Sequence, residues 1–274
     1  MKSYTPKEVE IFLNLLLSKQ GDTLLLHSAL GNLGKITNED LGKIPQIWLE
    51  ILTAQITQTK STLLMPSFNY NFPLSHFEDL REQKSEVGIL TEDFRKIASF
   101  RSNHPMFSFC ALGENAKTLI CPDKVEFNPF LQESLYHRLF LQNTLMVFLG
   151  IDIRVCTFMV YVEAMCGVKY RYFKPFFGEI ISQSGVAFKG DFYHFCLPRC
   201  ETLKVDYSCI NKKLLAHNII KVFSLGGGLV YAFRARDFFD FVAGELRLSP
   251  FILLESPPHF YYHFEEGQEK QILI

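Results

Sequence analysis

The chain has 274 residues, and its content of 48% hydrophobic and 21% charged residues is ordinary for a globular protein, which excludes disorder as a global description. Twenty-eight Lys and Arg residues balance 29 Asp and Glu residues, so the net charge of −1 gives no general attraction to nucleic acid or to an anionic membrane, and we expect neither as a partner. No apolar run approaches the roughly 20 residues of a membrane span, and an odd number of cysteines, seven, favours a reducing compartment, so we expect a cytoplasmic protein.

The first half of the chain predicts helices that alternate with buried strands. Thr5-Pro6-Lys7-Glu8 has the layout of a capping box, and apolar residues at helical spacing follow it up to Gln20-Gly21. Residues 23–27 and 61–66 are short apolar runs typical of buried strands, and residues 44–51 have helical periodicity. The order helix, strand, helix, strand indicates a largely parallel α/β core.

The second half continues this pattern and adds a β-rich part. Residues 67–90 are polar and irregular. The further expected elements are a short helix at 91–97, a strand at 144–150, a helix at 157–166, strands around 169–200, and helices at 210–224 and 234–246 on either side of a strand at 229–233. We therefore predict one domain, residues 1–274, of the mixed α/β class, in which helices flank a central, mostly parallel sheet and the β-rich part lies around 169–200.

The first candidate ligand site is the end of the strand at residues 23–27. His27-Ser28-Ala29 closes this strand, and a loop with Gly31 and Gly34 follows. In open α/β sheets ligands collect at the carboxyl ends of strands, where loop N–H groups meet phosphates or a thioester carbonyl. A purely structural turn explains such a strand end equally well, so both interpretations stay open at this point.

The second candidate is the segment from Arg101 to Ser108, which contains Ser102 and His104. A guanidinium, an imidazole and two hydroxyls so close together suit a phosphorylated ligand, because arginine offers a forked donor and the hydroxyls add hydrogen bonds. The alternative is a surface loop whose Arg and His are merely solvated.

The third candidate is Glu163, a carboxylate in an otherwise apolar helix. Thr157, Val160 and Glu163 follow one another at intervals of three residues and therefore share a broad face of that helix. Carboxylates are seldom buried without a partner, so Glu163 is either one half of a structural ion pair or a group placed for chemistry.

We expect no metal site. His194, Cys196, Cys200 and Cys209 lie near one another in the sequence, but their spacing matches no zinc-binding pattern and the segment has the character of a strand. The triple glycine at 226–228 lacks the further residues of a phosphate-binding loop, and a bend before a strand explains it better.

Several segments in a fixed order carry a similarity that extends over nearly the whole chain. They are LLHSALGNLG at 25–34, STLLMPSF at 61–68, GILTEDFR at 88–95, RSNHPMFSF at 101–109, ALG at 111–113 and SLY at 134–136, followed by the strand end Leu149-Gly150. In this order the segments resemble the aminoglycoside 3-N-acetyltransferase family, antibiotic acetyltransferases whose fold is unrelated to the GNAT fold.

The resemblance implies an enzyme that moves an acetyl group from acetyl-CoA, or an acyl group from another acyl-CoA, to an amine of a small-molecule amino sugar. It also implies that the cofactor lies along the His-Ser loop and the Arg-Ser-Xaa-His-Pro segment, and a homodimer is one option for the assembly. The residues expected on the cofactor side are His27, Ser28, Leu30, Arg101, Ser102, His104 and Ser108.

The acceptor side departs from the family pattern. After the strand end the family reads Asp-Ser-Asn-Thr-Xaa-Xaa-His-Xaa-Xaa-Glu, and this chain has Arg154, Cys156 and Val160 in the places of the Asp, the Asn and the His. Thr157 and Glu163 match the pattern. Attack on a thioester needs a neutral amine, and the family arrangement uses the His, oriented by the Glu, as general base. That relay lacks its middle member here.

Under the first of three hypotheses the protein is an acyltransferase with a changed acceptor. Glu163, with a pKa raised by its apolar setting, acts as the base directly or through water, and Thr157 is the second expected catalytic residue. Arg154 favours an anionic acceptor such as a nucleotide-linked or surface-glycan amino sugar, and the expected substrate-binding residues are Tyr70, Arg154 and Cys156. Acetylation of a cationic aminoglycoside is the runner-up, because an arginine stands where such a pocket needs a carboxylate.

Two other hypotheses stay open. The protein is a non-catalytic module that binds CoA, an acyl-carrier protein or another partner, because three acceptor-side residues are lost. Alternatively, Cys156 is a nucleophile whose pKa is lowered at the N-terminus of a helix, although cysteines in such places are commonly small packing residues.

The excess of aromatic residues, 27 Phe and 11 Tyr against one Trp, divides into two groups. Most of these rings are expected to fill the core in place of Leu or Val. Those at residues 68–72 and 170–177 are expected to flank the acceptor cleft, where a ring suits the face of a sugar or a base better than a polyamine.

Overall fold

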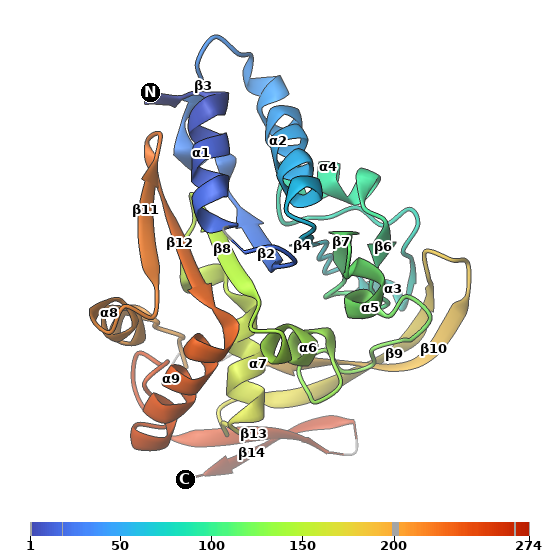
Figure 1. The fold of residues 1–274 in the computed structure, drawn as a ribbon. Coiled ribbons are helices and arrows are strands. Elements are labelled where there is room, and N and C mark those ends of the chain that lie inside the picture. Colours follow the sequence, from blue (N-terminus) through green and yellow to red (C-terminus); the bar gives the residue numbers. More distant parts are fainter. Residues whose placement is uncertain (1, 18, 199–202, 266, 274) are drawn as a thin grey trace.

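A computed structural model describes residues 2–17, 19–198, 203–265 and 267–273. Within these residues the largest sheet has seven strands in the order β11–β12–β8–β2–β4–β7–β6, and it runs through the middle of the molecule in Figure 1. In that order the strands are Lys221–Leu225, Gly228–Arg234, Leu145–Leu149, Thr23–Ser28, Thr62–Pro66, Phe109–Gly113 and Phe100–Arg101. The mixed α/β class predicted from the sequence is confirmed.

The parallel part of this sheet is narrower than the sequence predicts. β2 pairs in parallel with β4 and with β8, whereas the other neighbouring pairs in the described part of the sheet are antiparallel. Two of the antiparallel pairs are explained by short connections, because β12 follows β11 through a tight turn and β7 follows β6 through the 102–108 loop. The carboxyl ends of β8, β2 and β4 still meet at one edge of the sheet.

Helices cover both faces of the sheet (Figure 1). Leu24 and Leu26 of β2 pack toward one face and Leu25 toward the other, which is why this strand has an uninterrupted apolar sequence. None of the described helices combines the length and the apolar character of a membrane span. The helices on the first face are α1 (Pro6–Leu16), α2 (Ile44–Gln58) and α4 (Ile89–Ile97), and those on the second are α5 (Ala116–Ile120), α6 (Leu135–Leu141), α7 (Thr157–Met165) and α9 (Ala235–Leu248), with α8 (Ser208–Ala216) beside α9.

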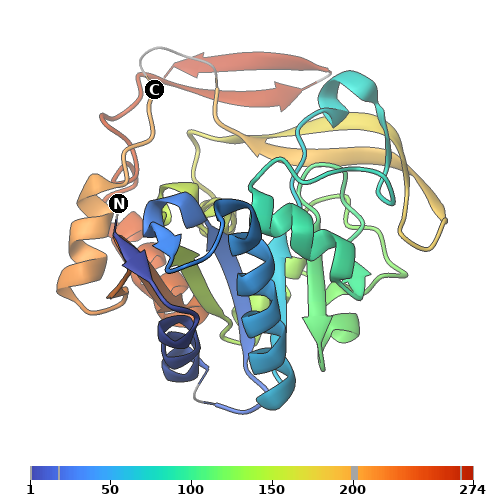
Figure 2. The ribbon, with the colours of Figure 1, turned by 90° about the horizontal axis from the view of Figure 1, so that it is seen from above.

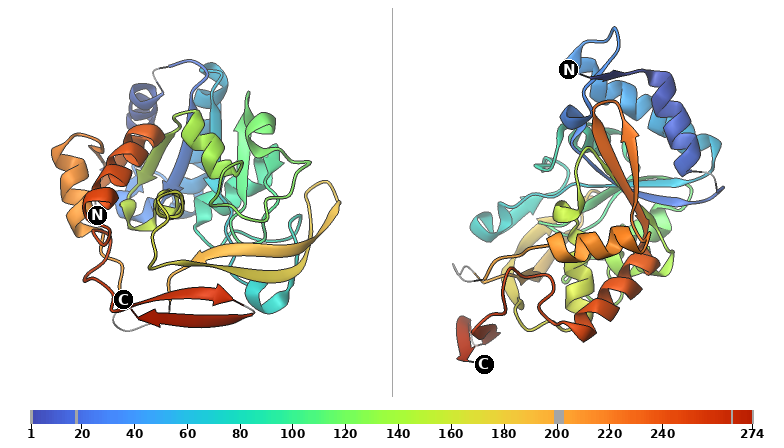
Figure 3. Two further views of the ribbon diagram at one scale, coloured as in Figure 1. Left: turned by 90° about the horizontal axis from the view of Figure 1, so that it is seen from below. Right: turned by 90° about the vertical axis from the view of Figure 1, so that its left-hand side faces the viewer.

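Two hairpins lie outside the large sheet. β9 (Tyr172–Ile181) and β10 (Ala187–Cys196) form the β-rich part expected around residues 169–200, and the short β5 (Phe77–Asp79) pairs in parallel with β9. The hairpin of β13 (Phe260–Glu265) and β14 (Gln268–Leu273) lies along β9, as Figures 2 and 3 show. Shorter elements are β1 (Ser3–Tyr4), which pairs with β3 (Lys35–Ile36), and α3 (Phe72–Ser75).

Local sequence signals predict the start of α1 correctly and misplace the end of α8. The capping box is confirmed, since Thr5 Oγ1 accepts from the Glu8 N–H at 3.2 Å and Glu8 Oε2 accepts from the Thr5 N–H at 2.7 Å. The helix expected at 210–224 is wrong in its second half: α8 ends at Ala216, Asn218 adopts a left-handed φ of 57°, and β11 follows. The bend predicted at the triple glycine is confirmed, with Gly226 at a φ of 59°.

Candidate active site

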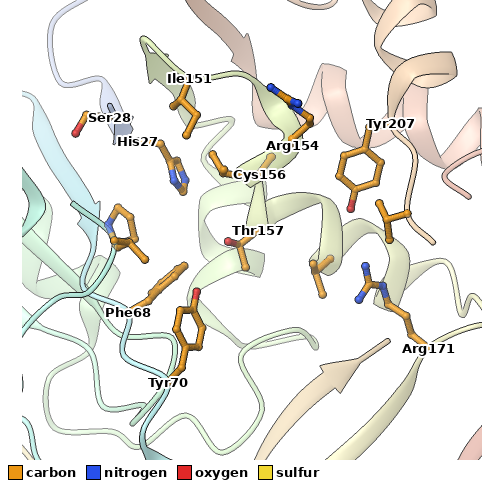
Figure 4. Close-up of a pocket in the computed structure, with 15 residues that line it drawn as sticks. His27, Ser28, Phe68, Tyr70, Ile151, Arg154, Cys156, Thr157, Arg171 and Tyr207 are labelled. Carbon is orange, nitrogen blue, oxygen red and sulfur yellow. The ribbon is translucent and has the colours of Figure 1, made fainter. Parts of the chain in front are cut away.

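A cavity of about 570 Å³ opens where the parallel strands end (Figure 4). His27 and Ser28 reach it from the end of β2, Pro66 from the end of β4 and Ile151 from the turn after β8. Because these strands are parallel, their carboxyl ends lie together and the loops that leave them enclose a crevice. The rest of the wall includes residues 154–157 at the start of α7, together with Tyr70, Arg171 and Tyr207.

His27 places a neutral imidazole in this cavity. Its ring stacks on the ring of Phe148, with the centroids 4.7 Å apart and an angle of 2° between the planes. Only 8% of the residue is exposed. Burial lowers the pKa of His27 to about 4, because desolvation disfavours the charged form. At neutral pH the imidazole is therefore uncharged.

The start of α7 forms another part of the wall. Cys156, the residue before the helix, is buried, and desolvation raises the pKa of its thiol to about 12. The hypothesis of a Cys156 nucleophile needs a lowered pKa, so it loses its physical basis. Thr157 follows Cys156 on the wall, and Figure 4 shows the hydroxyl of Tyr70 pointing toward it.

Glu163 lies behind the cavity wall. Its carboxylate is fully buried, accepts a hydrogen bond from the Tyr170 hydroxyl at 2.8 Å and forms an ion pair with Nε of Arg171 at 2.9 Å. Burial, the largest single effect, would lower the pKa of Arg171, but the attraction of Glu163 together with that of Tyr207 and Tyr170 outweighs it and the pKa is raised. Arg171 is the member of this pair that lines the cavity. The structure thus gives Glu163 a structural partner, and its role as a base stays a prediction.

Arg154 lies at the cavity with its charge already balanced. Its side chain is 81% exposed, and Nε donates to both carboxylate oxygens of Asp152, at 2.9 and 3.0 Å. A second hollow of about 500 Å³ adjoins the cavity here, since it shares Arg154 and Tyr207 and adds the side chains of Asp152 and Asp206. Two carboxylates as well as the arginine therefore lie at this side of the cavity.

The segment from Arg101 to Ser108 faces the protein interior. Arg101 is 2% exposed and donates hydrogen bonds to the carbonyl oxygens of Ser67, Leu80 and Gln83, to the side-chain oxygen of Gln83 and to Oγ of Ser108. The sequence suggests either that Arg101 binds a phosphorylated ligand or that it lies in a solvated surface loop. Both interpretations require an accessible guanidinium, and the observed one is buried. Instead Arg101 ties the 67–83 loop, which forms part of the cavity wall, to the edge of the sheet.

The other residues predicted on the cofactor side fall into two groups, those buried in the protein and those that line the cavity. Ser102 and His104 are buried and accept hydrogen bonds from backbone N–H groups of residues 106–109, and Leu30 is 7% exposed in the short helix after β2. Of the predicted cofactor residues, the structure brings His27 and Ser28 to the cavity. For the others, contact with the cofactor stays a prediction, and their observed hydrogen bonds and packing support the loops around the cavity.

The described residues considered for zinc are divided between a strand and a helix. His194 and Cys196 belong to β10 and Cys209 to α8, while Cys200 lies outside the described residues. In the part of the chain that the structure describes, no group of three or more His, Cys, Asp or Glu side chains is placed to hold a metal ion.

Sequence reasoning missed two polar residues of the cavity, Arg171 and Tyr207. A signal existed for Arg171, because a buried Glu163 requires a basic partner and Arg171 follows it closely in the chain. Tyr207 comes from a loop without a motif, so only the packing of that loop could reveal it.

This fold and cavity define a protein of the α/β class with a cavity at the carboxyl ends of parallel strands, the place where such folds hold small ligands. A family model described as aminoglycoside 3-N-acetyltransferase matches residues 25–247. The chain belongs to this family, whose members are N-acetyltransferases that use acetyl-CoA. No curated protein sequence matches the chain.

Solved structures share the fold at low sequence identity. The apoenzyme of aminoglycoside acetyltransferase AAC(3)-IVa is 22% identical with a TM-score of 0.70, over 94% of this chain and 93% of that one. AAC-IIIb in a binary complex with CoASH is 16% identical with a TM-score of 0.74, over 93% and 100% of the two chains. YokD from Bacillus subtilis is 18% identical with a TM-score of 0.71, over 91% and 96%. At these identities the likeness establishes the fold alone.

Proposed function

We propose that this protein transfers the acetyl group of acetyl-CoA to an amine of a cationic, aminoglycoside-type amino sugar, in the cavity at the ends of β8, β2 and β4. The observation that carries the proposal is that the whole described cavity wall, from His27 to Tyr207, lies inside the stretch that matches the family, residues 25–247. Structural neighbours support it, because AAC-IIIb binds CoASH and a histidine-to-alanine mutant of AAC(3)-IVa binds a gentamicin or apramycin.

The charges around the cavity favour a cationic acceptor over the anionic one that the sequence suggests. Each arginine of the wall has a carboxylate partner: Arg154 has Asp152, and Arg171 has Glu163. Asp206 adds a further carboxylate at the adjoining hollow, and it forms no ion pair among the described residues. An aminoglycoside, which carries several ammonium groups, would find there the carboxylates that its recognition requires.

The proposal assigns the two substrates to different parts of the wall. The end of β2, with His27 and Ser28, would face the acyl donor. Thr157, Cys156 and Tyr70 would face the acceptor, with the Tyr70 ring against a sugar face and the Thr157 hydroxyl as a hydrogen-bond partner.

The test is an acetylation assay with purified protein. Acetyl-CoA is mixed with gentamicin, apramycin or sisomicin in one series and with a nucleotide-linked amino sugar in another, and CoA thiol release and product mass are measured. We expect turnover in the first series. Turnover restricted to the nucleotide-linked sugar would contradict the cationic acceptor, and CoA binding without turnover of any amine would favour the non-catalytic module.

A double variant tests the role of the two carboxylates that line the second hollow, Asp152 and Asp206. In Asp152→Asn/Asp206→Asn the KM for aminoglycosides should rise about tenfold, which corresponds to about 1.4 kcal/mol, while kcat changes little, because the attractive charge of Asp206 is lost and the cation of Arg154 is left unbalanced at the entrance, away from the reacting atoms. Asp191→Asn, which changes an exposed carboxylate on β10, is the matched control and should leave KM unchanged. An unchanged KM in the double variant would remove the carboxylates from acceptor binding.

A further inference from the structure

The cavity holds several groups that can donate a proton and few that can accept one. Arg154 and Arg171 are cations held by carboxylates. Burial raises the pKa of Tyr70, Tyr207 and Cys156, so these groups keep their protons at neutral pH. Among the described residues of the wall there is no Asp or Glu. His27 is the remaining group with a basic lone pair at neutral pH.

We propose that His27 is the general base of the acetyl transfer, the group that takes the proton from the attacking amine. This inference rests on the proposed function and deepens it. Nothing in the sequence motifs assigned a proton-transfer role to this residue, which was expected on the cofactor side alone, and Val160 leaves α7 without an imidazole at the cavity.

The position of His27 is fixed from two sides. Its backbone lies in β2, between β4 and β8, and opposite Phe148 in the parallel register with β8. Its ring lies flat against the ring of Phe148, which leaves the edge with the two nitrogens free to point into the cavity (Figure 4). No hydrogen bond to these nitrogens is found within the described residues, so a substrate amine would not have to displace a protein partner. A base must be held in this way, within hydrogen-bond reach of the reacting atom.

The step balances with the groups named. The neutral amine nitrogen attacks the thioester carbonyl carbon, so that a C–N bond forms and the nitrogen becomes positively charged. His27 accepts the proton from this nitrogen, the C–S bond breaks, and CoA leaves as a thiolate. The imidazolium then returns the proton to the thiolate, which gives the amide, CoA thiol and neutral His27. Because burial disfavours the imidazolium, His27 is in its base form before the reaction; the same effect makes it a weaker proton acceptor, so it passes the proton on to the thiolate once the amine has released it.

The first experiment compares His27→Gln with the wild type on an aminoglycoside that the wild type acetylates. We expect kcat to fall by about 10²–10⁴-fold, the usual range for loss of a general base, while KM for the aminoglycoside and the affinity for CoA stay within about threefold. His217→Gln, an exposed histidine after α8, is the control and should keep full activity. In His27→Ala, added imidazole should restore part of kcat.

The experiment distinguishes a failure of the proposed function from a failure of the role proposed for His27. If the wild type acetylates no amine, the proposed function fails and the role of His27 fails with it. If the wild type is active and His27→Gln keeps kcat within about threefold, or loses only CoA affinity, the proposed function stands and His27 is not the base.

A second measurement covers the case in which the variants do not fold. The wild type is treated with diethyl pyrocarbonate, and the ethoxycarbonyl group on each histidine is quantified by mass spectrometry. We expect the loss of activity to follow modification of His27 and not that of His217. Enzyme that is fully modified at His27 and still active would overturn the inference.

Discussion

At the scale of single residues, the buried pair of Glu163 and Arg171 supports the wall of the cavity at the start of β9. Both side chains are largely buried, since 0% of Glu163 and 8% of Arg171 is exposed, and only Arg171 reaches the cavity. Removal of one partner from such a pair leaves an uncompensated buried charge, which costs about 3–5 kcal/mol. We therefore expect Glu163→Gln to lower the free energy of unfolding by about this amount, as measured by urea denaturation.

Two further variants show whether the stability lost in Glu163→Gln comes from the buried charge that is left unpaired. Glu163→Gln/Arg171→Met should recover part of the lost stability, because no charge is left buried. Glu245→Gln breaks a more exposed ion pair with Lys213 and should cost at most about 1 kcal/mol. If the double variant is stable and keeps kcat, Glu163 is structural and not the base; if it is stable and kcat is lost, turnover needs Glu163 or Arg171, which lines the cavity.

At the scale of elements, the end of β8 must approach the loop after β2 very closely. Gly150 has a φ of 67°, its N–H donates to Leu229 and its carbonyl accepts from Nδ2 of Asn32 at 2.7 Å. A Cβ at Gly150 would lie 2.6 Å from the carbonyl oxygen of Ala29, two residues after His27. We expect Gly150→Ala to lower the free energy of unfolding by about 2–3 kcal/mol and to raise KM for acetyl-CoA, because the loop must move.

The matched control for this element is Gly167→Ala. Gly167 has almost the same φ, 66°, but no atom lies within 4 Å of the added Cβ. Only the backbone strain remains there, about 1 kcal/mol, and KM should not change. Equal effects of the two substitutions in urea denaturation and in steady-state kinetics would show that the close approach at Gly150 is unimportant.

At the scale of the whole molecule, buried neutral histidines should make the fold sensitive to mild acid. Burial lowers the pKa of His27 to about 4, that of His104 to about 3 and that of His194 to about 4, from 6.5. Below pH 6.5 the unfolded chain therefore binds more protons than the folded one, so stability is complete above this pH and falls as the pH drops toward 4. Each histidine contributes a slope of up to about 1.4 kcal/mol per pH unit.

The contribution of one histidine can be isolated. Urea denaturation between pH 7 and about pH 5, above the range in which carboxylates titrate, should give a shallower slope for His27→Gln than for the wild type, by about one proton. Equal slopes would mean that His27 titrates in the folded protein as it does in the unfolded chain, and that it is not kept neutral by burial.

Much of the local structure could be predicted, whereas the partners of the charged side chains could not. Thr5 and Glu8 predict the start of α1 because a capping box acts over three residues, and the apolar run of β2 is explained by burial on both sides. Arg101, in contrast, has the sequence context of a phosphate ligand. Its partners come from residues 67, 80, 83 and 108, and a local motif carries no information about the first three. The pairing of Arg154 with Asp152, two residues away, was within reach of sequence reasoning.

By itself the sequence determined the α/β class, the order of the main elements, the strand end that carries His27 and the helix start that carries Thr157 just after Arg154, because periodicity, capping and turn formation depend on neighbours along the chain. The tertiary structure decided which strands are parallel and which charges are balanced. It also turned Arg101 inward and placed an uncharged imidazole in the cavity. These outcomes depend on desolvation and ion pairing between segments that are distant in sequence, and only the packed fold brings those segments together.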